Sequence, residues 1–223
     1  MTASRTPVPA ARAAADVAAP WRVVAEALRV GYRTRDMVIG GAFVTRIIEA
    51  AERADHHPDI DLRHGSVHLS LMTHSSHRIT EADVALANTI ARIADEMGLS
   101  GLSTPPQECQ ITIDALDIGA IRPFWRAVLG YREDPEHAET DLSDPAGRGP
   151  GIWFQQMDSP RPQRNRVHID LQIPADEVPA RVQAAQAAGG RLLTEHHAPA
   201  FWVLADPEGN EICLCTWQEP ATH

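Results

Sequence analysis

Histidines are concentrated in one short stretch of the first half of the chain. Of the 11 histidines, six lie between positions 56 and 77: His56, His57, His64, His68, His74 and His77. The ordinary pKa of histidine lies close to neutral pH, so such a cluster suits proton transfer. Imidazole also binds zinc, and histidines are common at helix ends and on solvated strands without any function. Acid–base catalysis, a metal site and an ordinary surface are therefore all open.

The spacing of these histidines disfavours zinc. His56 and His57 directly precede Pro58, which is expected to end a helix, so two neighbouring rings point to different sides. Pairs of metal ligands usually stand at i, i+4 on a helix or at i, i+2 on a strand, where the two side chains share a face. No cysteine precedes Cys109. Acid–base chemistry and a surface role remain.

Hydrophobic periodicity predicts which elements carry the cluster. A long helix is expected from a cap at Asp36 to about Ala54, and an alternating strand at 66–73 follows it. A last helix starts at Thr80. A short helix at 21–27 and a strand at 28–34 are expected to precede these elements.

A change in composition marks a domain boundary. The segment Leu99–Gln107 is rich in small residues and contains two adjacent prolines, which continue neither a helix nor a sheet. The second half then repeats itself: a strand at 110–116 and a helix ending at Gly130 are followed by a strand at 168–173 and a helix at 177–188. Further strand-like segments follow each helix, which predicts two tandem β-α-β-β-β modules. The predicted division is a flexible arm at 1–20, a domain at 21–99, a linker at 100–108 and a domain at 109–218.

Composition and charge exclude several functions. The net charge is −10, of which residues 106–223 contribute −9, so a general nucleic-acid partner is not expected. All 20 basic residues are arginines, which excludes Schiff-base and P-loop lysine chemistry. No apolar run is long enough to span a membrane. Three cysteines without a C-x-x-C pair indicate a reducing, cytoplasmic location.

Three short elements at fixed separations in the first half resemble a known family. They are Ala51-Glu-Arg-Ala-Asp-His-His-Pro58, Thr73-His74 and Ile79-Thr80-Glu81-Ala82-Asp83. The likeness is to the pterin-4a-carbinolamine dehydratase (4a-hydroxytetrahydrobiopterin dehydratase) family, and it runs from about Trp21 to Gly98. It implies an α+β fold with an antiparallel sheet, helices on one face of that sheet, and a homo-oligomer.

The resemblance also implies an activity and its residues. The activity is dehydration of a 4a-hydroxytetrahydropterin to the quinonoid dihydropterin, which supports recycling of a pterin cofactor. By position, His56 and His74 are the proton-transfer residues, His57 binds the pterin, and Asp83 holds an imidazole or a ring nitrogen. No metal or redox cofactor is needed, because imidazoles transfer protons near neutral pH. Thr80 and Asp83 also have the spacing of a helix-capping box, and both roles are open for Asp83.

Two segments of the first half depart from the family pattern. Asp59-Ile60-Asp61 stands where the family commonly has aromatic residues, and Ser75–Arg78 stands where it commonly has glycine. A bulkier loop with His77 and Arg78 beside the site is expected to narrow it or to change what it accepts.

The second half resembles the glyoxalase-like branch of the vicinal oxygen chelate superfamily from Cys109 to Trp217. The motifs are Phe124-Trp-Arg-Ala-Val-Leu-Gly-Tyr131, Asn165-Arg-Val-His-Ile-Asp-Leu171 and Asp206-Pro-Glu-Gly-Asn-Glu-Ile212. The resemblance implies that the paired modules form a cup-shaped sheet. Metal-binding members take ligands at positions matched here by Gln110, a residue near Phe154, His168 and Glu211. Gln110 is a weak ligand and Phe154 is none, so we expect no metal and favour a cup that binds a small molecule or only packs.

The sequence therefore favours a hydro-lyase acting on a small pterin, with its catalyst in the first half. Two alternatives remain open. One is a dehydratase-like module that serves only in dimerisation or binding. The other is a metal-dependent lyase or dioxygenase in the glyoxalase-like half.

Overall fold

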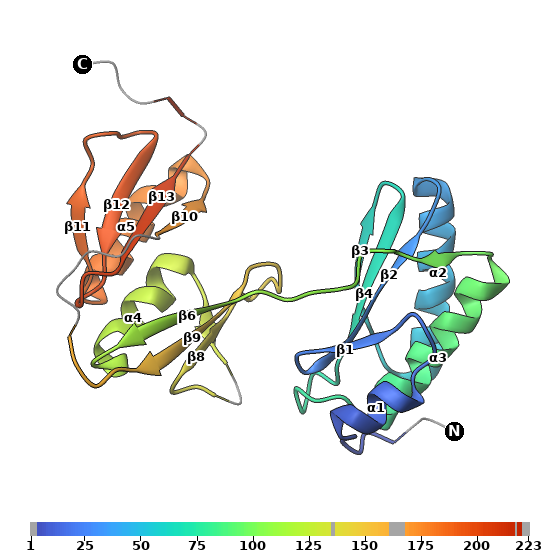
Figure 1. The fold of residues 1–223 in the computed structure, drawn as a ribbon. Helices are drawn as coiled ribbons and strands as arrows, with labels where there is room; N and C mark the ends of the chain where they lie inside the picture. Colours follow the sequence, from blue (N-terminus) through green and yellow to red (C-terminus); the bar gives the residue numbers. More distant parts are fainter. Residues whose placement is uncertain (1–3, 135–136, 161–167, 217, 220–223) are drawn as a thin grey trace. The chain divides into compact units, whose positions relative to one another are not determined.

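Residues 4–134, 137–160, 168–216 and 218–219 are described by a computed structural model. The chain divides into two compact units, Met1–Glu108 and Cys109–His223 (Figure 1). Two residue groups from the quoted motifs, 165–167 and Trp217, lie outside the described residues. No helix in the described part of the chain is long and apolar enough to cross a membrane.

The first unit contains an antiparallel sheet in which β3 (Asp59–Arg63) and β4 (Ser66–Leu71) turn their apolar residues to one side. The strands lie in the order β1 (Arg22–Val24), β2 (Ala27–Arg33), β4 and β3, and β5 (Ser100–Gly101) also pairs with β2. Along β4 the apolar residues are buried and the intervening residues are not, as alternation requires. The sequence did not predict β3, although its residues alternate in the same way.

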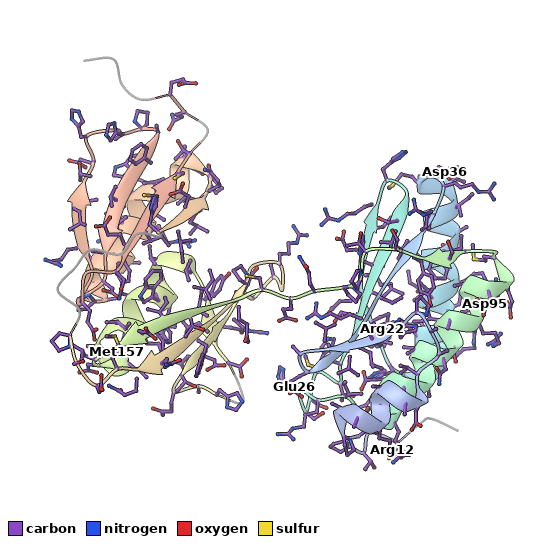
Figure 2. The ribbon with its side chains drawn as sticks, in the orientation of Figure 1. Arg12, Arg22, Glu26, Asp36, Asp95 and Met157 are labelled. Carbon is purple, nitrogen blue, oxygen red and sulfur yellow. The ribbon has the colours of Figure 1, made fainter. Side chains whose placement is uncertain are left out.

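Two long helices, α2 (Met37–Ala54) and α3 (Glu81–Glu96), cover one face of this sheet (Figure 1). The Asp36 side chain (labelled in Figure 2) accepts a hydrogen bond from the Ile39 backbone N–H and starts α2 as predicted. Phe43 and Ile47 on α2 and Ile90 on α3 are fully buried between helices and sheet. The α+β fold with an antiparallel sheet and helices on one face is thus confirmed.

Residues 4–20 differ from the flexible arm that was predicted for this part of the chain. The helix α1 (Ala10–Asp16) buries Ala13, and the backbone of residues 4–8 bonds to residues 79–82 at the start of α3. The helix expected at 21–27 is wrong, since β1 and the start of β2 occupy it. The expected linker contacts the first unit at two places: β5 pairs with β2, and Glu108 forms an ion pair with Arg29.

The second unit consists of two modules with the same order of elements. The first module contains β6 (Gln110–Ala115), α4 (Ile118–Leu129), β7 (Arg132–Glu133), β8 (Asp141–Ser143) and β9 (Gly151–Gln156). The second contains β10 (Ile169–Gln172), a 3-10 turn (Ala175–Glu177), α5 (Val178–Ala187), β11 (Arg191–Thr194), β12 (Phe201–Ala205) and β13 (Glu211–Cys215). In each module the first and last strands pair in parallel, and the other two strands extend the sheet beyond the last strand, in the orders β6-β9-β8-β7 and β10-β13-β12-β11. The predicted tandem modules are confirmed.

A shared core joins the two modules of the second unit. Phe124 and Trp125 on α4 are buried, and the Trp125 indole N–H donates to Asp206 of the second module at 2.9 Å. The Glu208 carboxylate accepts the backbone N–H groups of Leu116 and Asp117 in the first module. The turn 206–210, which is part of a glyoxalase-like sequence motif, therefore forms hydrogen bonds that connect the two modules.

Candidate functional site

The end of α2 directs one histidine into the first unit. Asp55 follows the helix in the left-handed conformation, with a φ of 50°, and reverses the chain. The next residue, His56, bonds through its backbone N–H to the carbonyl of Ala51 and is only 7% exposed. Its Nε2 lies 2.7 Å from the Oδ1 of Asp83, whose side chain is fully buried in the first turn of α3.

The second oxygen of Asp83 is surrounded by donors from the loop before α3. The Oδ2 atom accepts the backbone N–H of Thr80 at 2.7 Å and lies 2.8 Å from the Thr80 hydroxyl and 2.7 Å from the Thr73 hydroxyl. The two hydroxyls are also 2.7 Å apart, but each carries one proton, so a bond between them would take a donor away from the carboxylate. The capping box between Thr80 and Asp83 is present, and the same carboxylate holds His56. Asp83 therefore has both of the roles that the sequence left open.

These contacts set the charge of Asp83. Burial raises the pKa of its carboxyl group, but the hydrogen bonds from His56, Thr73 and Thr80 outweigh burial and lower the pKa overall. Asp83 is thus an ionised acceptor at neutral pH, and the proton in its bond with His56 lies on Nε2. The bond through Nε2 holds the ring of His56 in one orientation.

The other two predicted histidines lie on the surface. His57 is 52% exposed and its Nε2 lies 3.1 Å from Oε1 of Glu52. His74 is 64% exposed and its Nε2 lies 4.0 Å from Oδ1 of Asp59. Solvent exposure leaves both rings accessible to a small molecule.

Strand pairing brings all three histidines to the same end of the sheet. Asp59 pairs with Ser70, so the residues just before β3 run alongside those just after β4. His56 and His57 precede β3, and His74 follows Thr73, whose hydroxyl touches Asp83. His68 lies on the sheet face away from the helices, 3.1 Å from the Ser66 hydroxyl, and so stands apart from this group.

The loop that departs from the family pattern has a strained residue. His77 adopts the left-handed conformation with a φ of 48°, which glycine adopts without cost. This is the segment in which the sequence has Ser75–Arg78 in place of the glycine common in the family. Thr73 and Arg78 pair across the base of the loop, and this pairing positions the backbone at His74.

In the second unit, the register of β10 with β13 sets two of the weak metal-ligand candidates, His168 and Glu211, side by side on the face away from the core. Phe154 is 1% exposed and packs in the core, whereas alternation places Gln110 on the opposite face of the paired strands β6 and β9. Within the described residues, the three-residue group with converging ligand atoms is His168, Asp170 and Cys213, without Glu211. Asp170 and Cys213 were not among the residues predicted from the sequence, although His168 and Asp170 have the i, i+2 spacing of ligands on a strand.

The thiol of Cys213 is shielded from water and surrounded by acids. Burial and the neighbouring Asp170, with smaller contributions from Cys215 and Glu211, raise its pKa to about 12. The thiol is therefore protonated at neutral pH when no cation is near, which disfavours a role as a free nucleophile.

Comparisons with known proteins agree with this division of the chain. The family of the pterin 4 alpha carbinolamine dehydratases matches residues 6–93, and the glyoxalase-like domain family matches residues 110–215. A Thermomicrobium roseum protein named "Putative pterin-4-alpha-carbinolamine dehydratase" is 45% identical over 74 residues, which cover 33% of this chain and 80% of that protein. A Mycolicibacterium smegmatis protein of the same name is 42% identical over 76 residues, or 34% of this chain and 81% of the relative. The chain belongs to the pterin-4a-carbinolamine dehydratase family.

Solved structures resemble each half separately. The transcriptional coactivator/pterin dehydratase from Brucella melitensis is 26% identical and matches 40% of this chain and 99% of its own, with a TM-score of 0.38. A glyoxalase/bleomycin resistance protein/dioxygenase family enzyme from Burkholderia phytofirmans is 18% identical and matches 49% of this chain and 97% of its own, with a TM-score of 0.39. The match of residues 110–215 to the glyoxalase-like domain family shows that this pterin-4a-carbinolamine dehydratase family member carries a second, glyoxalase-like domain.

Proposed function

We propose that the first unit dehydrates a 4a-hydroxytetrahydropterin to the quinonoid dihydropterin by histidine acid–base catalysis. The observation that carries the proposal is the buried His56–Asp83 pair, with the exposed rings of His57 and His74 at the same end of the sheet. A carboxylate that fixes one ring nitrogen of a histidine prepares the other nitrogen for proton transfer.

The reaction needs two proton transfers and no change of redox state. The C4a hydroxyl leaves as water once it is protonated, and the ring N5 loses its proton as the C4a–N5 double bond forms. One imidazole supplies the first proton and the other takes the second, so the enzyme ends with the proton count with which it began. His56 and His74 are assigned to these transfers, His57 to binding the pterin, and Asp83 to positioning His56.

The decisive experiment is the disappearance of a 4a-hydroxytetrahydropterin in the presence of the purified full-length protein. We expect turnover by the unaltered protein and a loss of about 10²–10⁴-fold in kcat for His56→Ala. His68→Ala is the matched control, because it removes an imidazole from the same unit on the other face of the sheet. A folded protein without turnover would instead favour the binding-module alternative. Equal turnover in His56→Ala would overturn the assignment of His56.

The proposal also covers the oligomeric state that the family resemblance suggests and the location of the protein in the cell. We expect a homo-oligomer that acts on a small-molecule pterin in the cytoplasm and needs no cofactor for this step. Size-exclusion chromatography with light scattering tests the oligomeric state.

A further inference from the structure

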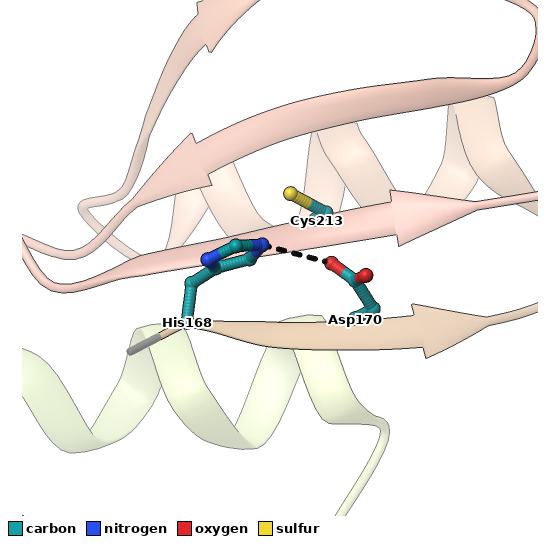
Figure 3. Close-up of side chains that lie close together, drawn as sticks. All are labelled: His168, Asp170 and Cys213. Atoms are coloured by element: carbon teal, nitrogen blue, oxygen red, sulfur yellow. Dashed lines mark ion pairs between the residues drawn. The ribbon is translucent and has the colours of Figure 1, made fainter. Parts of the chain in front are cut away.

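The second unit gathers three chemically different ligand groups on one face of its second sheet (Figure 3). His168 immediately precedes β10, Asp170 lies on β10, and Cys213 lies directly opposite Asp170 on the parallel strand β13. The Nε2 of His168 is 3.4 Å from Oδ1 of Asp170, and the ligand atoms of all three residues lie within 4.8 Å of one another.

The pairing of β10 with β13 explains why these side chains converge. Residues two apart on a strand share a face, and directly paired residues on neighbouring strands stand side by side. The intervening residues Ile169, Ile212 and Leu214 turn to the other face and pack in the core. The cluster is therefore held by a regular sheet and not by a loop.

The cluster combines two solvent-exposed side chains with one buried side chain. The side chains of His168 and Asp170 are 53% and 58% exposed, whereas Cys213 is only 8% exposed. The buried sulfur of Cys213 can hold a bound group at the sheet surface, and the exposed side chains of His168 and Asp170 can move to contact that group. Solvent would still reach one side of such a group.

The chemistry of the three donors fits zinc among common divalent ions. Thiolate, imidazole and carboxylate are the zinc ligands in proteins, and three protein ligands leave a fourth position for water. Tetrahedral bonds of about 2.0–2.3 Å separate ligand atoms by about 3.3–3.8 Å, which the His168–Asp170 distance already meets. One carboxylate and one thiolate balance the charge of a divalent cation. Magnesium and calcium prefer sites made only of oxygen ligands, so this set selects against them.

We propose that His168, Asp170 and Cys213 form a zinc-class divalent metal site with one open coordination position. This set differs from the one that the family resemblance suggested, since it replaces Glu211 and the first-module positions with a residue pair from β10 and β13. The site is independent of the dehydratase reaction proposed for the first unit.

The test is titration of the metal-free, full-length protein with Co²⁺, which substitutes for zinc and is visible. We expect one Co²⁺ per chain, a thiolate-to-cobalt charge-transfer band in the near ultraviolet, strong visible bands typical of four-coordinate cobalt, and displacement by Zn²⁺ but not by Mg²⁺. Cys213→Ser should abolish the thiolate band. Cys215→Ser and Cys109→Ser are the matched controls and should retain it, because neither sulfur belongs to the cluster.

Two exposed variants keep the test independent of folding. His168→Ala and Asp170→Asn should each weaken Co²⁺ binding by about 100-fold or more, since loss of even an outer partner of a metal ligand typically costs about 10–100-fold. Both side chains are more than half exposed, so the fold should be unchanged in thermal melts without metal. The proposal is overturned if the unaltered protein shows no thiolate band, if the band survives in Cys213→Ser, or if Glu211→Gln abolishes binding while Asp170→Asn does not.

Discussion

Each half of the chain contains a histidine–aspartate pair, and the two pairs are built in opposite ways. His56 and Asp83 lie 2.7 Å apart with side chains that are 7% and 0% exposed. His168 and Asp170 lie 3.4 Å apart with side chains that are 53% and 58% exposed. The first pair joins two elements far apart in the sequence, whereas the second joins neighbours at the start of one strand.

The difference shows how burial decides what such a pair can do. The buried carboxylate has donors on both oxygens, so it stays ionised and holds one imidazole in one orientation. An exposed pair is screened by water and contributes little to stability, and its side chains remain free to rearrange. The first arrangement suits proton transfer by a fixed ring, and the second suits capture of a cation beside Cys213.

The largest effects are expected from removing the surface histidines beside the buried pair. His74→Ala should lower kcat by about 10²–10⁴-fold if this imidazole transfers a proton. His57→Ala should mainly raise KM, because it removes a contact made about equally in the ground and transition states. Steady-state kinetics of both variants, with His64→Ala as the control, separate the two roles. A fall in kcat for His57→Ala with unchanged KM would contradict the assignment of His57 to binding and would assign it to proton transfer.

Neutralising the two aspartates should give contrasting losses of stability. Asp83→Asn places an amide N–H₂ against the donors of Thr80, so we expect the free energy of unfolding to fall by about 3 kcal/mol. Asp170→Asn should change it by less than about 1 kcal/mol, because that pair is exposed. Calorimetric unfolding of the full chain without metal measures both. Equal losses would show that burial is not what distinguishes the pairs.

The buried pair also predicts a dependence of stability on acid. The pKa of Asp83 is lower in the folded state than its ordinary value of 3.8, so its contribution is complete above that value and is lost as the pH falls toward the folded-state pKa. The stability difference between the unaltered protein and Asp83→Asn should therefore shrink as the pH falls below about 4. Urea unfolding across this range is the measurement. A difference that grew on acidification would contradict the sign of the shift.

A smaller effect is expected in the loop that carries His77. Replacing this left-handed residue with glycine relieves backbone strain but increases the freedom of the unfolded chain, so the two effects offset each other. His77→Gly should change the free energy of unfolding by less than about 1 kcal/mol. Activity should stay within about threefold, since His77 has no role in the proposed proton transfers. A large loss of turnover, with stability unchanged, would place His77 in the site.

No effect on dehydration is expected from removing metal or the second unit. The proposed reaction uses imidazoles alone, so EDTA should leave turnover unchanged while it strips Co²⁺ from the second unit. We also expect the fragment 1–108 to fold and to retain the activity, because the pairing of β5 and the contact of Glu108 with Arg29 complete the first unit. Assays of the full chain with and without EDTA, and of the fragment without EDTA, test the two expectations separately. Inactivity of a folded fragment would show that the units share a site.

The sequence alone predicted the elements that repeat or alternate strongly. The start of α2 at Asp36 and the tandem modules of the second half follow from local caps, periodicity and repetition, which need no knowledge of tertiary contacts. The spacings of the motifs were also sufficient to identify the family. The short strands β3, β7 and β8 were missed, because a few residues of alternation become a strand only when a partner strand pairs with them.

The tertiary structure decided which residues act together. Motif spacing named His56 and Asp83, but only the packing of the α2 terminus against α3 shows that they are bonded in the interior while His57 and His74 stay in solvent. Residues 4–20 belong to the segment expected to be flexible, but the buried Ala13 and the backbone bonds to the start of α3 give them order.

In the second unit, too, the tertiary structure decided which side chains meet. The sequence supplied His168 and Glu211 from family positions, whereas the pairing of β10 with β13 sets Cys213 against Asp170, although 43 positions separate them along the chain. A linear sequence specifies which side chains share a strand face, since alternation is local. Which strands become neighbours depends on burying the whole core, and that is why the converging donors emerge only in the folded protein.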